Sequence, residues 1–130
     1  MKKMAVVSML MVLAMSVLVY AASADKVKIA VASDGKTASS AISGVAARSA
    51  YYLIFDGKGN FIEAVVNPYK SAGGGAGSLV VNFLAAKGVT GIVAGKFGDK
   101  MIGAMKGAGI DYVEFSGISD DGVKKYLQRK

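Results

Sequence analysis

The 130-residue sequence contains no cysteine, no histidine and no tryptophan, and it contains a single proline. Without cysteine the chain forms no disulfide bonds. Without cysteine and histidine it lacks the thiolate and imidazole ligands of most structural zinc, haem and iron–sulfur sites. The missing imidazole also removes the usual base of serine-based catalysis. Any inorganic ligand would therefore have to be held by other donors.

The N-terminus has the features of an export signal. Two lysines precede an apolar run from Met4 to Tyr20, and Ala22-Ser23-Ala24 then fits the small-x-small pattern of a cleavage site. We predict a signal peptide over residues 1–24, cleavage before Asp25, and a periplasmic or secreted mature protein. The alternative is an uncleaved membrane anchor, but the run is slightly shorter than the ~20 residues of a spanning helix.

Residues 25–130 form a basic segment of the size of one domain. Basic residues outnumber acidic ones by 16 to 9 in the whole sequence, which gives a net charge of +7. Loss of Lys2 and Lys3 with the signal peptide leaves +5. A chain of roughly a hundred residues can bury one hydrophobic core, and no repeat or linker divides it. Its basic surface suits an anionic partner.

Hydrophobic periodicity predicts an α/β domain with the element order β-β-β-α-β-α-β-α. Alternating, β-branched runs predict strands, and apolar residues at helical spacing predict helices. Turn residues between the second and third strands predict a hairpin. The predicted strands cover residues 26–32, 51–56, 61–67, 90–94 and 110–115, and the predicted helices cover residues 78–87, residues 99–106 and a C-terminal segment.

The expected helix ends rest on capping residues. Asp99 is the expected N-cap of the second helix, and Ser119 or Asp120 is that of the third. Gly107 and Gly109 are expected to end the second helix, because glycine favours helix termination.

The element order also predicts which loops lie together. An antiparallel meander followed by two β-α-β crossovers gives a five-stranded mixed sheet with helices on its faces. The first, third, fourth and fifth strands then point the same way, and the loops that follow them share one edge. Open α/β sheets bind ligands at that edge. The segments gathered there are residues 33–36, Arg48, residues 69–77, Lys96 and Lys100.

The glycine-rich stretch from Ser71 to Ser78, which leads directly into a predicted helix, is the clearest local candidate for a binding site. Glycine lets backbone amides approach a ligand, and a helix N-terminus favours an anion. The stretch is neither a Walker A loop nor a G-x-G-x-x-G motif, and the alternative is a surface loop without a ligand. The candidate binding residues at the whole edge are Ser33, Lys36, Arg48, Gly73, Gly74, Gly75, Ala76, Gly77, Lys96 and Phe97.

Six stretches, in order along nearly all of residues 25–130, match the pattern of a known family. They are K-I-A-V-A-S-D-G (28–35), R-S-A-Y-Y-L-I-F-D (48–56), N-P with G-G-G-A-G (67–77), L-A-A-K-G-V (84–89), I-V-A-G-K-F-G (92–98) and G-I (109–110). The sequence thereby resembles the dinitrogenase iron–molybdenum cofactor biosynthesis family. That family includes cofactor carriers of nitrogenase assembly and the Orange Protein of sulfate reducers.

The resemblance implies a ribonuclease H-like α/β fold and a non-catalytic protein that binds an anionic metal–sulfur cluster for storage, scavenging or assembly. The implied cluster is of the molybdenum–copper sulfide or iron type. Family members often carry His-Phe-Gly-Arg where this sequence has Val45-Ala46-Ala47-Arg48, so only Arg48 carries over. The Orange Protein-like form fits this chain better than a histidine- or cysteine-ligated carrier, because its cluster is held largely without covalent ligands. Amides, lysine and arginine can donate to sulfide.

Three alternatives stay open. Met101 and Met105 lie four residues apart on one helix face and suit Cu(I), although such methionines more often fill a core. A regulatory or structural module would use the same edge for a protein partner or a phosphate-bearing ligand. A ribonuclease H-type nuclease would hold two magnesium ions through acidic residues. The four candidate acids are Asp34, Asp56, Glu63 and Asp99, but roles in turns and helix caps explain them more simply. We expect no nucleic-acid partner and, after cleavage, no membrane association.

Overall fold

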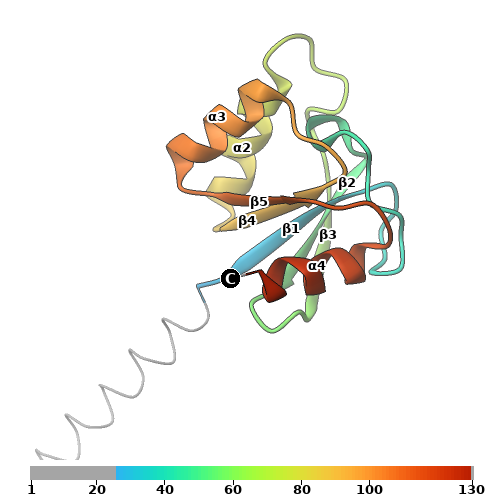
Figure 1. Ribbon diagram of the computed structural model, residues 1–130. Coiled ribbons are helices and arrows are strands. Elements are labelled where there is room, and N and C mark those ends of the chain that lie inside the picture. The colour runs from blue at the N-terminus through green and yellow to red at the C-terminus, as the bar shows by residue number, and fades with distance from the viewer. Residues whose placement is uncertain (1–25, 130) are drawn as a thin grey trace, which may run out of the picture.

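The computed structural model describes residues 26–129. The predicted signal peptide and its cleavage site lie outside these residues. The described chain follows the predicted element order, with a short 3₁₀ helix before the second strand (Figure 1). The elements are β1 (Lys28–Ser33), the 3₁₀ helix η1 (Ala46–Arg48), β2 (Tyr51–Asp56), β3 (Phe61–Val66), α2 (Ala76–Ala86), β4 (Gly91–Ala94), α3 (Asp99–Ala108), β5 (Asp111–Glu114) and α4 (Ser119–Gln128).

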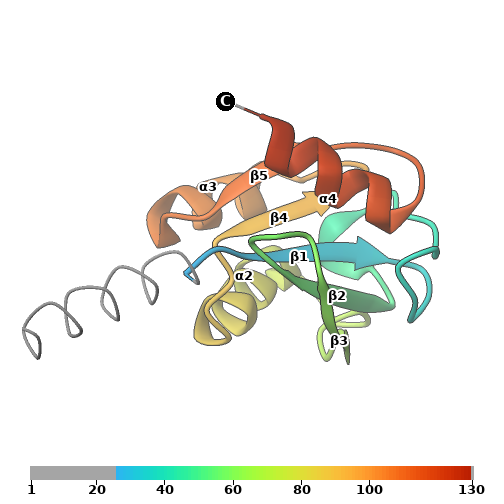
Figure 2. The ribbon, with the colours of Figure 1, turned by 90° about the horizontal axis from the view of Figure 1, so that it is seen from below.

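The five strands form one mixed sheet in the order β3-β2-β1-β4-β5, and Figure 2 looks onto it with the strands side by side. β2 pairs antiparallel with β1 and β3, whereas β4 pairs parallel with β1 and β5. The predicted meander and crossovers are therefore confirmed. β1, β3, β4 and β5 point toward one end of the sheet, which we call the carboxyl end, and β2 begins there.

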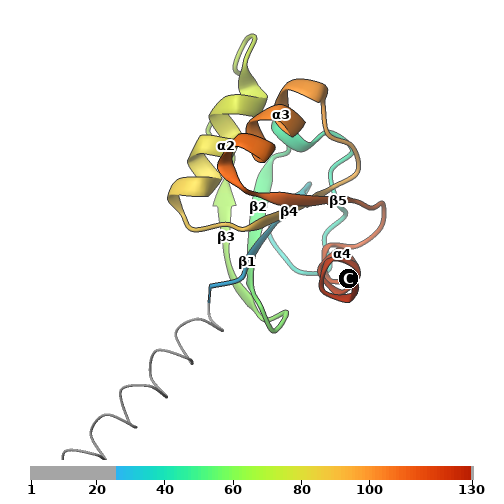
Figure 3. The ribbon, with the colours of Figure 1, turned by 60° about the vertical axis from the view of Figure 1, so that its left-hand side comes forward.

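Helices cover both faces of the sheet. α2 and α3 lie together on one face and α4 lies on the other (Figures 1 and 3). Alternate residues of β1 enter the two cores, because successive side chains of a strand point to opposite faces. Ala30 and Ala32 pack in the core beneath α2 and α3, and Ile29 and Val31 pack in the core beneath α4. Burial on both faces explains the almost continuous apolar sequences of β1 and β4.

The start of α2 differs from the prediction. The helix begins at Ala76 rather than Ser78, with Gly75 as the residue before it. Gly75 has φ = 84°, in the left-handed region that glycine adopts without strain. The last part of the glycine-rich stretch therefore forms the first turn of the helix.

The predicted side-chain caps of the other two helices were wrong. Gly98 and Ile118 precede α3 and α4, and neither of these described helices has a side-chain hydrogen bond at its N-cap. Ser119 instead donates its Oγ proton to the carbonyl oxygen of Ser40 at 2.8 Å, which ties α4 to the loop after β1. A tertiary contact thus uses the hydroxyl group that was expected to cap the helix.

Two glycines were predicted to end α3, and one of them does so. Gly107 lies inside the helix, whereas Gly109 follows it with φ = 71°. Among residues 26–129, no helix combines the length and the apolar character needed to cross a membrane.

Candidate anion-binding site at the carboxyl end of the sheet

The predicted site residues are divided between the two faces of the sheet. Ser33 is buried at the end of β1, where its Oγ donates to the carbonyl oxygen of Gly35 at 2.8 Å. Lys36 lies in the loop that packs on the α4 face, with its Nζ 5.5 Å from the ring centroid of Tyr51. Arg48, the glycine-rich stretch, Lys96 and Phe97 lie with α2 and α3. The structure therefore brings the second group together and places Ser33 and Lys36 apart from it.

The glycine loop (residues 69–75) leads from β3 to α2 and extends beyond the helices (Figure 3). Helical hydrogen bonding in α2 starts with the amide of Leu79, which donates to Gly75 O at 3.2 Å. No acceptor within residues 26–129 is found for the preceding amides of Ala76, Gly77 and Ser78. The first turn of α2 also contains no acidic residue. Unpaired amides and the helix dipole make this end suitable for an anion.

The glycines of this region have different structural roles. A Cβ atom at Gly77 would lie 2.9 Å from Cβ of Met101, so this glycine permits the close approach of α2 to α3. A Cβ atom at Gly73 or Gly74 would meet no atom within 4 Å, and neither residue has positive φ. The fold therefore has no steric requirement for glycine at positions 73 and 74. Glycine at these positions leaves the backbone open to a ligand.

Arg48 makes three hydrogen bonds to the glycine loop. Its Nη1 donates to the carbonyl oxygens of Lys70 at 3.1 Å and Ala72 at 2.7 Å, and its Nη2 donates to that of Gly73 at 3.2 Å. The predicted role was direct contact with an anion. In this structure the guanidinium instead holds three backbone carbonyl groups of the neighbouring loop.

Asn67, which did not appear among the predicted site residues, holds the base of the same loop. Its Nδ2 donates to the carbonyl oxygens of Ala47 at 2.9 Å and Ser49 at 3.0 Å, and its Oδ1 accepts from the amide of Tyr69 at 2.9 Å. Asn67 is buried, with 4% of its surface exposed. The sequence signal for this role was the Asn-Pro pair directly after β3.

Residues 43–49, which we call the bridging segment, connect the loops at the carboxyl end. The amide of Ser43 donates to Ala32 O at 2.8 Å, and the amide of Gly95 donates to Ser43 O at 2.9 Å. The amide of Ala46 donates to Lys96 O at 3.0 Å. Together with Arg48 and the Asn67 contacts, these bonds fix the glycine loop and the loop after β4 to one segment.

Tyr52 supports the bridging segment from within the core. Its hydroxyl group donates to the carbonyl oxygen of Ala46, and the side chain is fully buried. Burial raises the pKa of this phenol well above its ordinary value of 10.0, because the charged form would be poorly solvated. The hydroxyl group thus stays protonated and keeps its bond to the segment even above pH 10.0, where an exposed tyrosine loses its proton.

The loop after β4 is less favourable for an anion than the start of α2. Phe97 is buried, its ring centroid lies 4.9 Å from that of Tyr112, and its amide donates to Oε2 of Glu114 at 3.1 Å. The first turn of α3 contains Asp99. Two carboxylates thus lie near this helix end, while Lys96 is exposed beside them.

Met101 and Met105 are buried in the core beneath α2 and α3, with 2% and 0% of their surfaces exposed. Their placement supports core filling over contact with copper. Asp56 accepts from the amides of Asn60 and Lys58, both at 2.9 Å, and these bonds lower the pKa of its carboxyl group. Its turn role is therefore confirmed. Within residues 26–129 there is no group of three or more acidic residues that could hold a metal ion.

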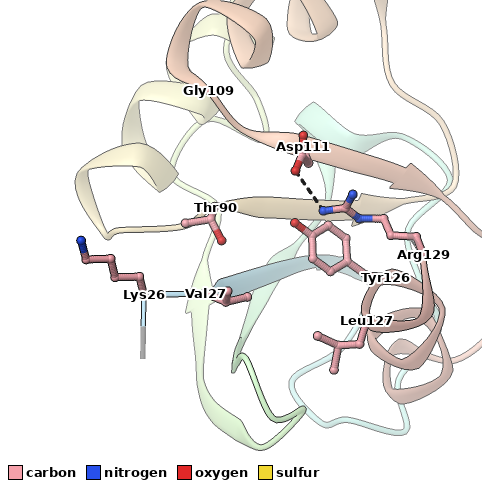
Figure 4. Close-up of a pocket in the computed structure, with 8 residues that line it drawn as sticks. All are labelled: Lys26, Val27, Thr90, Gly109, Asp111, Tyr126, Leu127 and Arg129. Atoms are coloured by element: carbon pink, nitrogen blue, oxygen red, sulfur yellow. Dashed lines mark hydrogen bonds and ion pairs between the residues drawn. The ribbon is translucent and has the colours of Figure 1, made fainter. Parts of the chain in front are cut away.

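A pocket of about 350 Å³ lies at the opposite end of the sheet (Figure 4). Its charged groups largely satisfy one another, since Arg129 Nη2 lies 2.9 Å from Asp111 Oδ2 and the guanidinium lies 4.1 Å from the ring centroid of Tyr126. None of the predicted site residues lines it. The lining residues are Lys26, Val27, Thr90, Gly109, Asp111, Tyr126, Leu127 and Arg129.

The chain belongs to the dinitrogenase iron–molybdenum cofactor family, whose model matches residues 26–129. The family resemblance of the sequence is therefore confirmed. Among solved structures, the apo form of the orange protein from Desulfovibrio gigas is 25% identical with a TM-score of 0.73, over 77% of this chain and 86% of that chain. A protein from Thermotoga described as a NifB protein is 31% identical with a TM-score of 0.66, also over 77% and 86%. No curated protein matches the chain.

Proposed function

We propose that this protein is a non-catalytic binding protein for an anionic metal–sulfur cluster, which it stores, scavenges or passes on during assembly. Membership of a family named for an iron–molybdenum cofactor supports a metal cluster as the cargo. The structural observation that carries the proposal is the start of α2, where three amides have no acceptor within residues 26–129. These amides follow an open glycine loop, and no acid occupies the first turn of the helix.

The donors at this end fit a cluster with sulfide on its surface. The chain has no cysteine or histidine, so it offers no thiolate or imidazole to a metal. Backbone amides and the exposed side chains of Lys70, Lys96 and Lys100 are hydrogen-bond donors, and sulfide is an acceptor. A cluster that carries its own sulfide ligands therefore matches this donor set better than bare metal ions. We propose the molybdenum–copper sulfide type, in keeping with the similarity to the orange protein.

Absorbance provides the direct test. Mature protein purified from its native host should show a charge-transfer band in the visible range, and elemental analysis should find molybdenum or iron together with sulfur. Colourless and metal-free protein that also fails to take up tetrathiomolybdate with Cu(I) would contradict the proposal. Tight binding of inorganic phosphate in that case would favour the regulatory module instead, since the same amides suit a phosphate group.

We also propose that the protein acts in the periplasm or outside the cell. The proposal rests on the N-terminal sequence pattern alone. Intact-mass measurement of the exported fraction should give a chain that begins at Asp25. Recovery of only the full-length chain from the membrane fraction would show that the segment is an anchor.

A further inference from the structure

Arg48 provides three hydrogen bonds to a short stretch of glycine-loop backbone. The carbonyl oxygens of Lys70, Ala72 and Gly73 all accept from its two terminal nitrogens, at 2.7 to 3.2 Å. These carbonyl groups lie just before the α2 amides that the proposed function assigns to the anion. The Arg48 side chain thus binds three carbonyl groups of the loop that leads to the amides at the start of α2.

The chemical consequence is a separation of the two kinds of backbone group. A carbonyl oxygen carries partial negative charge and would repel an anion, whereas an amide attracts one. The hydrogen bonds to Arg48 point these carbonyl oxygens toward the guanidinium, whose positive charge offsets their partial negative charge. The loop then approaches α2 in one fixed conformation, even though Gly73 and Gly74 would otherwise allow many.

We propose that Arg48 is a positioning residue for the anion site, which holds the glycine loop rather than contacting the bound anion. This inference rests on the proposed function. The guanidinium is suited to the task because its planar fork presents several donors at fixed angles. A lysine would keep the charge but would offer a compact ammonium group that cannot reproduce this fork.

The competing explanation is that Arg48 leaves the loop and binds the anion directly through its charge. The two explanations differ for Arg48→Lys. A positioning role predicts that Arg48→Lys and Arg48→Ala lose affinity alike, by about tenfold or more. A direct charge contact predicts that Arg48→Lys keeps most of the affinity. The probe is tetrathiomolybdate, with binding followed by absorbance at several salt concentrations.

The salt dependence of tetrathiomolybdate affinity provides a second test of the positioning role. Removing a charge that contacts the anion flattens the dependence of affinity on salt, because ion pairs are screened. Arg48→Ala should therefore flatten the salt dependence no more than Lys96→Ala does, although it weakens binding more. Lys96→Ala is the matched control, because this lysine is also exposed and is proposed to act through its charge. A salt dependence that is flattened more by Arg48→Ala than by Lys96→Ala would overturn the positioning role.

Backbone ¹⁵N relaxation tests the role without any ligand. The amides of Gly73 and Gly74 should have order parameters near ~0.85 in the wild type, and values below ~0.6 in both Arg48 variants. Unchanged order parameters in Arg48→Ala would contradict the inference directly. If the wild type fails to take up tetrathiomolybdate both alone and with Cu(I), the proposed function is wrong, and the relaxation result alone then decides whether Arg48 holds the loop.

Discussion

The two ends of the sheet place charge in opposite ways. At the end with the pocket, Arg129 pairs with Asp111 and lies over Tyr126, so the positive group is already satisfied by its neighbours. At the carboxyl end, Arg48 binds backbone carbonyl groups instead of a carboxylate, and the first turn of α2 contains no acidic residue. The pocket lies at the first of these ends, and the α2 amides that have no acceptor within residues 26–129 lie at the carboxyl end. For an anion, donors matter more than the depth of the hollow.

The two helix N-termini at the carboxyl end differ in the same way. The first turn of α2 contains no acid, whereas the first turn of α3 contains Asp99. Glu114, at the end of β5, also accepts a hydrogen bond from the amide of Phe97 in the loop before α3. Both helix ends carry the same dipole. Local side chains therefore distinguish the two helix ends, and they make the start of α2 the more suitable place for the proposed anion.

The largest effect is expected for Gly74→Val. A Cβ atom at this position would meet no atom within 4 Å and the backbone does not have positive φ, so the fold should be unaffected. Tetrathiomolybdate binding should fall by more than tenfold, because the side chain would obstruct the approach to the loop backbone. Gly75→Val is less informative, since the left-handed conformation of Gly75 adds strain of about 1–3 kcal/mol.

The matched control is Gly107→Val, at another open position near the far end of α3. It should bind tetrathiomolybdate as the wild type does. Equal loss of binding in the two valine variants would show that the glycine loop is not the site.

The next effect concerns the support of the bridging segment by Tyr52. Tyr52→Phe leaves the buried carbonyl group of Ala46 without its partner, which should cost about 1–3 kcal/mol of the free energy of unfolding. In the wild type this phenol stays protonated in the native state, while in the unfolded chain it loses its proton above its ordinary pKa of 10.0. Wild-type stability should therefore fall as pH rises above 10.0.

Denaturant titrations between pH 8 and pH 11 measure both parts of this prediction. The stability lost by the wild type over that range should exceed the loss in Tyr52→Phe. Parallel pH profiles would mean that the Tyr52 hydroxyl group is not held in its buried, protonated form.

The smallest effect is expected from single exposed lysines. Lys96→Ala should weaken tetrathiomolybdate binding about twofold to fivefold, because an exposed charge contributes about 0.2–1 kcal/mol. Lys58→Ala, in the turn at the opposite end of the sheet, should have no effect. The two variants have the same charge, so binding through diffuse positive charge predicts equal losses, and a difference between them locates the site.

The fold could be predicted from the sequence because its signals are local. Alternating and β-branched residues identified β2 at its observed bounds, and the strand directions followed from the element order. Helix starts were less predictable, because they depend on partners far along the chain. Ser119, for example, bonds to Ser40 rather than to its own helix. The ribonuclease H-like assignment and the signal peptide stay predictions.

The candidate site could be predicted only as a set of loops at one end of the sheet. Topology brings Ser33 and Lys36 to the same end as Arg48, but side-chain direction places them on the α4 face. The bonds of Arg48 to three carbonyl groups could not be predicted, since its charge suggested an anion partner. Its place among the binding residues stays a prediction. Asn67 was not predicted as a site residue, because the Asn-Pro pair marks a turn and does not show which backbone groups the buried amide binds.

The proposed function places an anionic sulfide cluster at the start of α2. An amide NMR titration of the mature protein with tetrathiomolybdate and Cu(I) tests this placement. We expect the largest shifts at Gly73 to Ser78 and smaller shifts in the bridging segment, and we expect Thr90, Asp111 and Arg129 to stay unchanged. Shifts concentrated at those three pocket residues, with the α2 amides unaffected, would contradict it.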